Sequence, residues 1–269
     1  MFVLMAIGVE IYISMGVASL FYLIFATDTP LNLIPNTMVD GVNNYSLLAI
    51  PFFILAGELM NRSGITLKLV NFTNFFIGKL KGGLAYSVVG VNVFSAGVSG
   101  SAPADCSAVS SVMLPAMKKD GYKESFSAAI NASAATIGPI IPPSIPMVFL
   151  ALLTNLSVGK LFLGGIIPGL MMGISLMLVL YIMMRKQDLP KVEVKRSWKE
   201  FIKLFKDTFF ALIAPLIILF GIVFAITTIT EVAILATAYV LFVGIFIYKK
   251  IKLKDLPKVF SDTALFSST

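Results

Sequence analysis

The sequence predicts an all-α membrane protein, a polytopic helical bundle that contains a re-entrant helical hairpin and a broken helix. Hydrophobic residues occupy 58% of the 269 positions and charged residues only 13%, a balance that a soluble domain of this size would not tolerate. Apolar runs of helical length recur along the chain, and two stretches among them are rich in Gly, Pro and Ser. Non-helical backbone at membrane depth persists only where it is buried in protein or lines a wet cavity, so these two breaks indicate an ion or solute site.

Residues 1–80 are predicted to form scaffold helices and an interfacial arm. The apolar run 2–25 is long enough to cross a hydrocarbon core, but Glu10 interrupts it, so it forms either one span with a buried acid or two shorter passes. A second apolar run covers 45–60. The stretch 62–81 mixes four basic residues with apolar and aromatic ones, which is typical of an amphipathic helix in the membrane interface.

Residues 81–160 are predicted to hold the hairpin, at about 84–117, and the broken helix, at about 124–154. Basic residues stand on both sides of the first segment, within 79–81 and within 118–123. Basic loops favour the cytoplasmic side, so this segment should leave and re-enter on one face. Its tip then falls at the sequence GVSGSAPAD.

The remainder of the chain is predicted to form one long span, a basic linker and further helices. Residues 161–184 are apolar enough to cross the membrane alone. Residues 185–206 read as a cytoplasmic, basic and amphipathic linker, in which Trp198 and two phenylalanines at helical spacing anchor a surface helix. Residues 207–269 contain two more apolar segments that begin and end at basic loops.

The first break offers oxygen atoms to a hard cation. Ser99, Ser101, Asp105 and Ser107 carry side-chain oxygens, and Gly100 allows the backbone to turn and free its carbonyls. A carboxylate at this depth is costly and usually functional, so Asp105 is either a ligand or the cap of the helix that follows. A structural turn and small-residue helix packing are the alternatives. The pattern favours an ion or solute role.

The second break cannot remain helical. Four prolines and one glycine lie within residues 138–146, and each proline removes an N–H and clashes with the preceding turn. Thr136 lies on the helix that enters the break, and carbonyls around Ile140 should be free. The half-helix that starts near Pro146 would point its positive end toward an anion. The alternative is a kinked structural helix.

The residue inventory argues against an enzyme. The chain has no histidine, which excludes HExxH zinc sites and any Ser–His or Cys–His dyad within it. The tetrapeptide 97–100 matches the GxSG pattern of rhomboid-type intramembrane proteases, but the general base is missing. Cys106 is the single cysteine, so it forms no internal disulfide and is interpreted as a small packing residue.

The charge pattern favours a membrane topology signal over nucleic-acid binding. The net charge is +7, and most Lys and Arg residues gather in 185–206 and 249–258. Such clusters are typical of cytoplasmic loops. Glu58 and Glu231 stand near the ends of apolar segments and are interpreted as interface or packing partners.

Long stretches of the chain resemble the large membrane subunit of tripartite ATP-independent periplasmic (TRAP) transporters, the DctM type. They are LLAIPFFILAGELMNRSGIT from Leu47, KGGLAYSVVGVNVFSAGVSGSAPADCSAVSSVMLPAMKKDGY from Lys81 and NASAATIGPIIPPSIPMVF from Asn131. The resemblance continues through GKLFLGGIIPGL from Gly159 and TEVAILATAY from Thr230. It therefore covers nearly the whole chain.

The resemblance implies an elevator-type secondary transporter of the bacterial cytoplasmic (inner) membrane, built from two repeats of inverted topology. This chain would hold the first repeat, and residues 207–269 would begin the second, which is incomplete. Na⁺ is the coupling ion of that family. The implied partners are a small membrane subunit of the DctQ type and an extracytoplasmic substrate-binding protein of the DctP type. The implied substrate is an organic anion such as a C4-dicarboxylate, sialic acid or another sugar acid.

Carried over by position, the resemblance implies that the hairpin tip and the broken helix face each other across the site. The residues implied for Na⁺ are Ser99, Gly100, Ser101, Asp105, Ser107, Thr136, Gly138 and Ile140. Those implied for the substrate are Ser99, Ser101, Pro142, Pro143 and Ser144.

Two other hypotheses fit the sequence. One is a carrier similar to divalent-anion/Na⁺ symporters, which works without a binding protein. The other is a truncated fragment that does not transport, because the chain stops before a second hairpin or a second broken helix.

Overall fold

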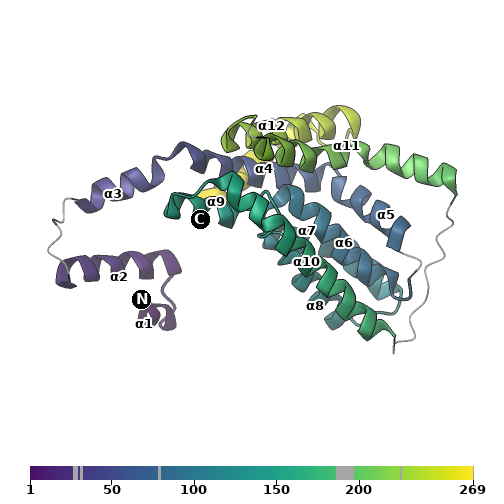
Figure 1. Cartoon of the computed structure of the whole chain (residues 1–269), viewed down its shortest axis with the longest axis horizontal. Helices are drawn as coiled ribbons and strands as arrows, with labels where there is room; N and C mark the ends of the chain where they lie inside the picture. The colour runs from purple at the N-terminus through teal and green to yellow at the C-terminus, as the bar shows by residue number, and fades with distance from the viewer. Residues whose placement is uncertain (27–29, 31–32, 78–79, 186–196, 225, 269) are drawn as a thin grey trace. The chain divides into compact units, whose positions relative to one another are not determined.

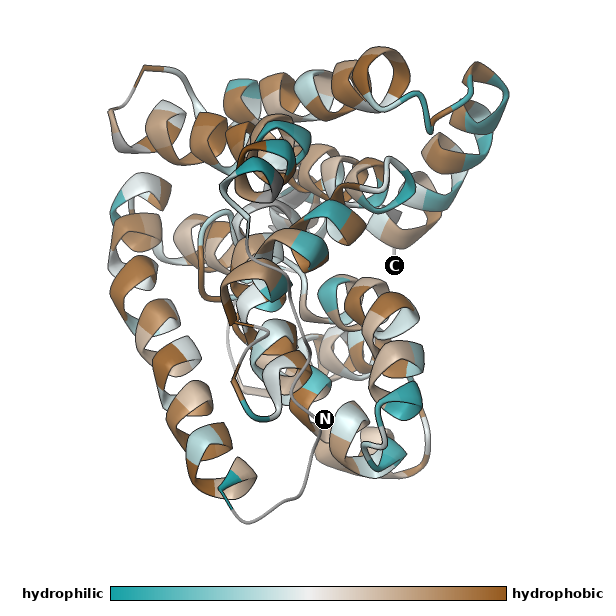
Figure 2. Ribbon diagram, turned by 90° about the vertical axis from the view of Figure 1, so that its right-hand side faces the viewer, coloured by the Kyte–Doolittle hydropathy of each residue, from teal (hydrophilic) through white to brown (hydrophobic). Residues whose placement is uncertain are grey.

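The computed structural model describes residues 1–26, 30, 33–77, 80–185, 197–224 and 226–268, and in this part of the chain it confirms an all-α protein. Three described helices are long and apolar enough to span a membrane: Val158–Met184, Phe201–Ile222 and Ile229–Ile247. Figure 2 shows hydrophobic residues along most turns of the long helices. The protein is therefore a multi-pass membrane protein.

The chain divides into two compact units, of which the first covers Met1–Asn44. It contains α1 (Phe2–Ala6), α2 (Ile11–Ala26) and α3 (Leu33–Val42). The backbone leaves the helix at Gly8, whose φ of +89° suits glycine. The apolar run that contains Glu10 is thus divided between the five-residue α1 and the longer α2. It is not one continuous helix, and α1 is too short to be a membrane pass.

The second unit covers Tyr45–Thr269 and contains the remaining helices. The 3₁₀ turn η1 (Tyr45–Leu48) leads into α4 (Ala49–Arg62), and α5 (Ile65–Ile77) follows after Gly64. The hairpin segment forms α6 (Gly83–Ser99) and α7 (Ala102–Lys119). The broken helix forms α8 (Glu124–Ala135) and α9 (Ile145–Thr154), which are separated by non-helical residues.

Four further elements complete the second unit. Helix α10 (Val158–Met184) is the longest, and α11 (Trp198–Val223) follows the residues that are not described. Helix α12 (Ile229–Phe242) continues into a π-helical turn, η2 (Val243–Ile247). The 3₁₀ turn η3 (Leu253–Asp255) then leads into α13 (Leu256–Ser268).

The basic linker differs from the expectation in its described part. Residues 186–196 lie outside the described residues, and from Trp198 onward the chain is one continuous helix through Val223. The boundary expected at residue 206 therefore falls inside α11. The physical reason is that Lys, Phe, Ile and Leu are all compatible with a helix, so the change from basic to apolar composition does not end it.

Two packed groups of helices position the hairpin. Helices α6, α7, α8 and α10 lie side by side (Figure 1) and enclose a core that includes Val88, Met113 and Leu180. Helices α4 and α12 pack closely through alanines, and the Thr237 hydroxyl donates to the Phe52 carbonyl at 2.8 Å. The Cα of Ser99 lies 3.4 Å from where a Cβ on Gly57 would stand, so the hairpin tip packs against α4.

Candidate functional site

The two breaks of the sequence meet in the structure. The Ile145 amide at the start of α9 donates to the Gly100 carbonyl at the hairpin tip, at 3.4 Å. Gly100 has a φ of +58°, and a Cβ there would collide with the Pro143 carbonyl. Only glycine allows both this backbone conformation and this approach. The hairpin tip and the broken helix therefore form one backbone-lined contact.

Asp105 lies at the centre of this contact. It stands in the first turn of α7 and is 1% exposed. Its Oδ2 atom has no hydrogen-bond partner among the described residues, and a Cβ on Gly138 would stand 2.6 Å from it. The Ser99 side chain also interacts with this carboxyl group. Burying a carboxylate without a partner is costly, so this oxygen is available to a ligand.

The structure argues against one of the two roles considered for Asp105, the cap of the following helix. The residue at the N-cap position of α7 is Ser101, and no described backbone N–H donates to the Asp105 carboxylate. Asp105 is therefore not the cap of α7. Its position in the first turn, near the positive end of the helix dipole, lowers the cost of a negative charge there.

A cavity of about 310 Å³ opens on the other side of the hairpin tip. Three serines of the hairpin contribute oxygens to its wall: Ser99, Ser101 and Ser107. Helices α4 and α13 supply the other polar lining residues, which are Glu58, Asn61, Asp262 and Thr263. No Lys or Arg is among the described residues that line it. The wall is thus rich in oxygen and acidic.

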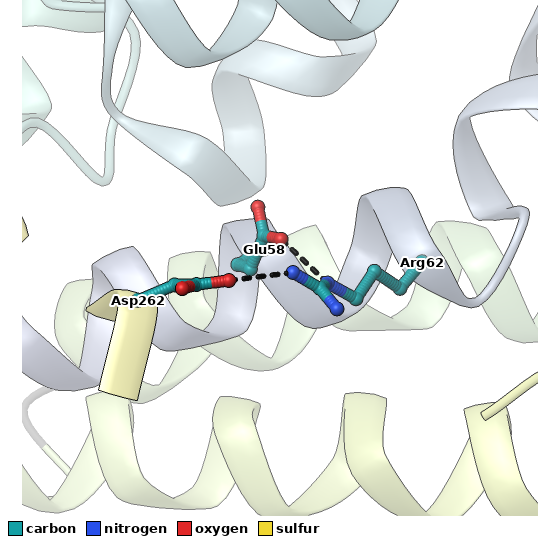
Figure 3. A network of polar contacts seen from close by, with 3 residues as sticks. All are labelled: Glu58, Arg62 and Asp262. Carbon is teal, nitrogen blue, oxygen red and sulfur yellow. Dashed lines mark hydrogen bonds and ion pairs between the residues drawn. The ribbon is translucent and has the colours of Figure 1, made fainter. Parts of the chain in front are cut away.

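Arg62 holds the two acids of this wall (Figure 3). Its Nε atom donates to Glu58 Oε1 at 2.6 Å, and its Nη2 atom donates to Asp262 Oδ2 at 2.9 Å. The pair with Glu58 is within α4, whereas the pair with Asp262 joins α4 to α13. One arginine between two carboxylates leaves a net charge of −1, which favours a cation over an anion at this wall.

The hairpin and the broken helix are also joined by a buried amide network. The Asn131 side chain on α8 donates to the Cys106 carbonyl at 2.8 Å and to Ser110 Oγ at 2.7 Å, both on α7. Asn92 on α6 donates to Asn131 Oδ1 at 3.1 Å. Both asparagines are fully buried. The network fixes α7 against α8 one residue from Asp105, and so it holds Asp105 beside Gly138.

The structure brings most of the predicted hairpin residues to the site. Ser99, Ser101 and Ser107 line the cavity, and Gly100 and Asp105 contact the broken helix. From the second break, Gly138 and Pro143 lie against the hairpin. The roles assigned to these residues stay predictions, because contact between them does not by itself reveal a ligand.

Four predicted residues of the second break have other surroundings. The Thr136 hydroxyl is exposed and donates to the Ser133 carbonyl at 2.7 Å, because Thr136 still belongs to the last turn of α8. The Ile140 carbonyl lies against Gly165 of α10. Pro142 packs in an apolar groove with Phe162 and other residues of α10 and α11. Ser144 caps α9, where its Oγ accepts from the Met147 amide at 3.2 Å.

Sequence reasoning missed the side of the cavity that α4 and α13 supply. Neither Asn61 nor Asp262 was assigned to the site, and Glu58 was interpreted as an interface or packing partner. The sequence signal that could have found this side of the cavity is Glu58, an acid inside the apolar run 45–60, with Arg62 four residues later. Glu231, which was interpreted as an interface or packing partner, instead completes a capping box with Thr228 at the start of α12.

Fold and site together define a polytopic all-α membrane protein in which a helical hairpin contacts a broken helix and also lines an oxygen-rich cavity with α4 and α13. The sequence matches the model of the DctM component of tripartite ATP-independent periplasmic transporters over residues 1–269. The chain belongs to this family. It is 40% identical over 247 residues to the C4-dicarboxylate TRAP transporter large permease protein DctM of Vibrio cholerae, a match that covers 91% of this chain and 54% of the relative.

Two further relatives carry other substrate names. The sialic acid TRAP transporter large permease protein SiaM of Vibrio cholerae is 34% identical over 95% of this chain and 60% of its own length. The isethionate TRAP transporter permease protein DctMQ of Oleidesulfovibrio alaskensis is 38% identical over 92% of this chain and 39% of its own length. The chain thus spans about half the length of the curated relatives it matches.

Proposed function

We propose that this chain forms the membrane part of a Na⁺-coupled secondary transporter that imports an organic anion delivered by a binding protein. The family membership supports the transport role, and the relatives are named for C4-dicarboxylate, sialic acid and isethionate, which are all organic anions. The partners we propose are a small membrane subunit and an extracytoplasmic substrate-binding protein, and the location is the bacterial cytoplasmic membrane.

The unpartnered Asp105 oxygen carries the Na⁺ part of this proposal. A hard cation prefers oxygen ligands, and the site offers the Asp105 carboxylate, the Ser99 hydroxyl and backbone carbonyls next to Gly100 and Gly138. Bound there, Na⁺ would supply a positive charge that draws the hairpin and the broken helix together. Release of the ion would leave Asp105 unpaired between them, so binding and packing of the two elements are coupled.

The acidic cavity wall supports the proposed dependence of anion binding on a cation. The cavity has a size that suits a small organic acid. Its described lining has no Lys or Arg, and Arg62 neutralises only one of the two charges on Glu58 and Asp262, so the wall keeps a net negative charge. An anion would therefore bind weakly to the empty site. The Ser101 and Ser107 hydroxyls can donate hydrogen bonds to a carboxylate, and a cation beside Asp105 would offset the repulsion.

The first experiment measures Na⁺ binding to the purified chain by isothermal titration calorimetry, with K⁺ as the comparison ion. We expect saturable Na⁺ binding that Asp105→Asn abolishes, because the neutral amide removes the charge but keeps the shape. Asp120→Asn is the matched control, since Asp120 ends the same helix away from the contact. Equal Na⁺ binding by the two variants would rule out the site.

The second experiment measures uptake of labelled C4-dicarboxylate, sialic acid and isethionate into proteoliposomes that contain the chain and its small subunit. Inward Na⁺ and K⁺ gradients are compared, each with and without the binding protein. We expect uptake only with Na⁺ and the binding protein. Uptake without the binding protein would favour a symporter that acts alone, and uptake with K⁺ would overturn the proposed coupling.

A further inference from the structure

The N-terminal half of α11 carries an open apolar groove that the transport proposal does not use. Its volume is about 450 Å³. Four phenylalanines and an isoleucine form nearly all of its lining, and one lysine stands at its edge: Phe201, Ile202, Phe205, Phe209, Phe210 and Lys206. Phe205 and Phe209 are 41% and 44% exposed, so the groove is open to the surroundings of the protein.

The groove lies at one end of a membrane span. The apolar part of α11 that can cross a membrane runs from Phe201 to Ile222, and Trp198, which is 75% exposed, stands one turn before it. Tryptophan concentrates at the level of the lipid headgroups. The groove therefore begins near the headgroups and continues toward the acyl chains.

Helix α5 holds one wall of the groove in place. Figure 1 shows α11 extending past α5, and the two helices are in contact. The Phe201 ring lies 5.9 Å from that of Phe75 and 6.0 Å from that of Phe76, and the Phe205 and Phe209 rings are 5.8 Å apart. The groove is thus built from packed rings and does not depend on a single side-chain conformation.

A row of lysines runs along the same part of α11. Lys199, Lys203 and Lys206 are exposed and follow one another at helical spacing. In the described part of the chain none of the three forms an ion pair with a carboxylate. Two acids, Glu200 and Asp207, accompany the three lysines in the sequence from 198 to 210. The row has a net positive charge at headgroup level.

We propose that this groove binds an anionic phospholipid, with the phosphate on Lys203 and Lys206 and an acyl chain among the phenylalanines. An apolar groove that is continuous with exposed lysines matches an amphipathic anion, whereas a small hydrophilic anion would leave the phenylalanines unused. The site is far in sequence from the hairpin tip and involves no residue assigned to ion or substrate binding. Through this site the protein would bind anionic lipids of the surrounding bilayer.

Native mass spectrometry of the purified chain tests this proposal. The chain is titrated with phosphatidylglycerol and with phosphatidylcholine of the same acyl composition, and the lipid adducts are counted. We expect preferential binding of phosphatidylglycerol. Each lysine near the headgroups should contribute about a fivefold preference, so Lys203→Gln with Lys206→Gln should lower it more than tenfold. Lys254→Gln with Lys258→Gln, an exposed pair near the C-terminus, should leave it unchanged.

Two further arms separate a lipid from a free anion. Phe205→Ala should weaken both lipids, because it removes part of the acyl contact while the lysines remain. Inorganic phosphate at equal concentration should not displace phosphatidylglycerol. Equal binding of the two lipids, the same loss in the control pair, or full displacement by phosphate would each overturn the proposal.

Discussion

Helices α6 and α10 pack against each other, yet they relate to their surroundings in opposite ways. Every described residue of α6 is buried except Val93 and Phe94, although the helix carries Ser87, Asn92 and Ser95. Helix α10 is almost entirely apolar, and most of its side chains are exposed. The more polar helix is thus the inner one. In a bilayer, apolar surface gains nothing by burial in protein, so small and polar residues mark the interior.

Helices α10 and α6 contact the broken helix through different kinds of residue. Half of the six buried residues of α10 are glycines, at 165, 169 and 173. The first two allow the non-helical residues between α8 and α9 to approach, whereas Gly173 lies against Val93 of α6. A Cβ on Gly165 would collide with the Ile140 carbonyl, and one on Gly169 with the Ile141 side chain. On the other side, α6 connects to α8 through the Asn92 and Asn131 amides. Glycine contacts and amide bonds together set the position of the broken helix.

The largest effect is expected when side chains are added to the glycine face of α10. Gly165→Val should cost more than about 3 kcal/mol of stability, because the new side chain meets backbone that cannot move aside. Gly164→Val is the matched control one residue away, where a Cβ has nothing within 4 Å. Thermal unfolding in detergent should show a large loss for the first variant only. Equal losses of stability in the two variants would mean that the change in helix propensity, and not the collision with the Ile140 carbonyl, causes the loss.

The second prediction concerns the amide network on the polar side. Asn131→Ala should cost about 2 kcal/mol, because it removes two donors and leaves Ser110 and the Cys106 carbonyl without their shared partner. Ser133→Ala on the same helix is exposed and should be neutral. If the network positions Asp105, Asn131→Ala should also weaken Na⁺ binding in the folded protein. A loss of stability with unchanged Na⁺ binding would restrict the network to a structural role.

The third prediction tests whether every polar group on α6 stabilises the fold. The Ser95 hydroxyl is buried and has no hydrogen-bond partner among the described residues. Ser95→Ala should therefore be neutral or stabilising by about 0.5 kcal/mol, since no hydrogen bond is lost. A marked drop in the melting temperature would reveal a partner such as a bound water or ion that uses this hydroxyl.

The smallest effect is expected outside both helices, at the ion pair between Lys118 and Glu124 in the turn after the hairpin. Hydrogen bonding to Lys118 lowers the pKa of Glu124 and raises that of Lys118. The contribution of Glu124 is therefore present above the ordinary carboxyl pKa and disappears as the pH falls through the lowered value. Both groups are exposed, so Lys118→Gln should leave the melting temperature at neutral pH nearly unchanged. A drop of several degrees would contradict this.

Much of the fold could be predicted because it depends on local rules. The four prolines and one glycine within 138–146 require a break wherever the chain folds, and the composition of 161–184 requires a span. The hairpin followed from the break at Gly97–Ser101 together with the basic residues at both of its ends. In the candidate site, the predicted hairpin residues do lie at the contact. The predicted residues of the second break are divided between that contact, α10 and the cap of α9.

The helices in the long apolar runs, the positions where a helix is impossible and the family resemblance all followed from the sequence, because propensity, proline chemistry and long motifs are properties of neighbouring residues. The packing of the helices, in contrast, brings Asp105 to Gly138, places Arg62 between Glu58 and Asp262, and turns the Ile140 carbonyl toward α10. Apart from the Arg62–Glu58 pair within α4, these contacts join residues that are 25 to 200 positions apart in the chain. The direction of a carbonyl or carboxylate at such a contact depends on how whole helices pack, and no local pattern encodes it.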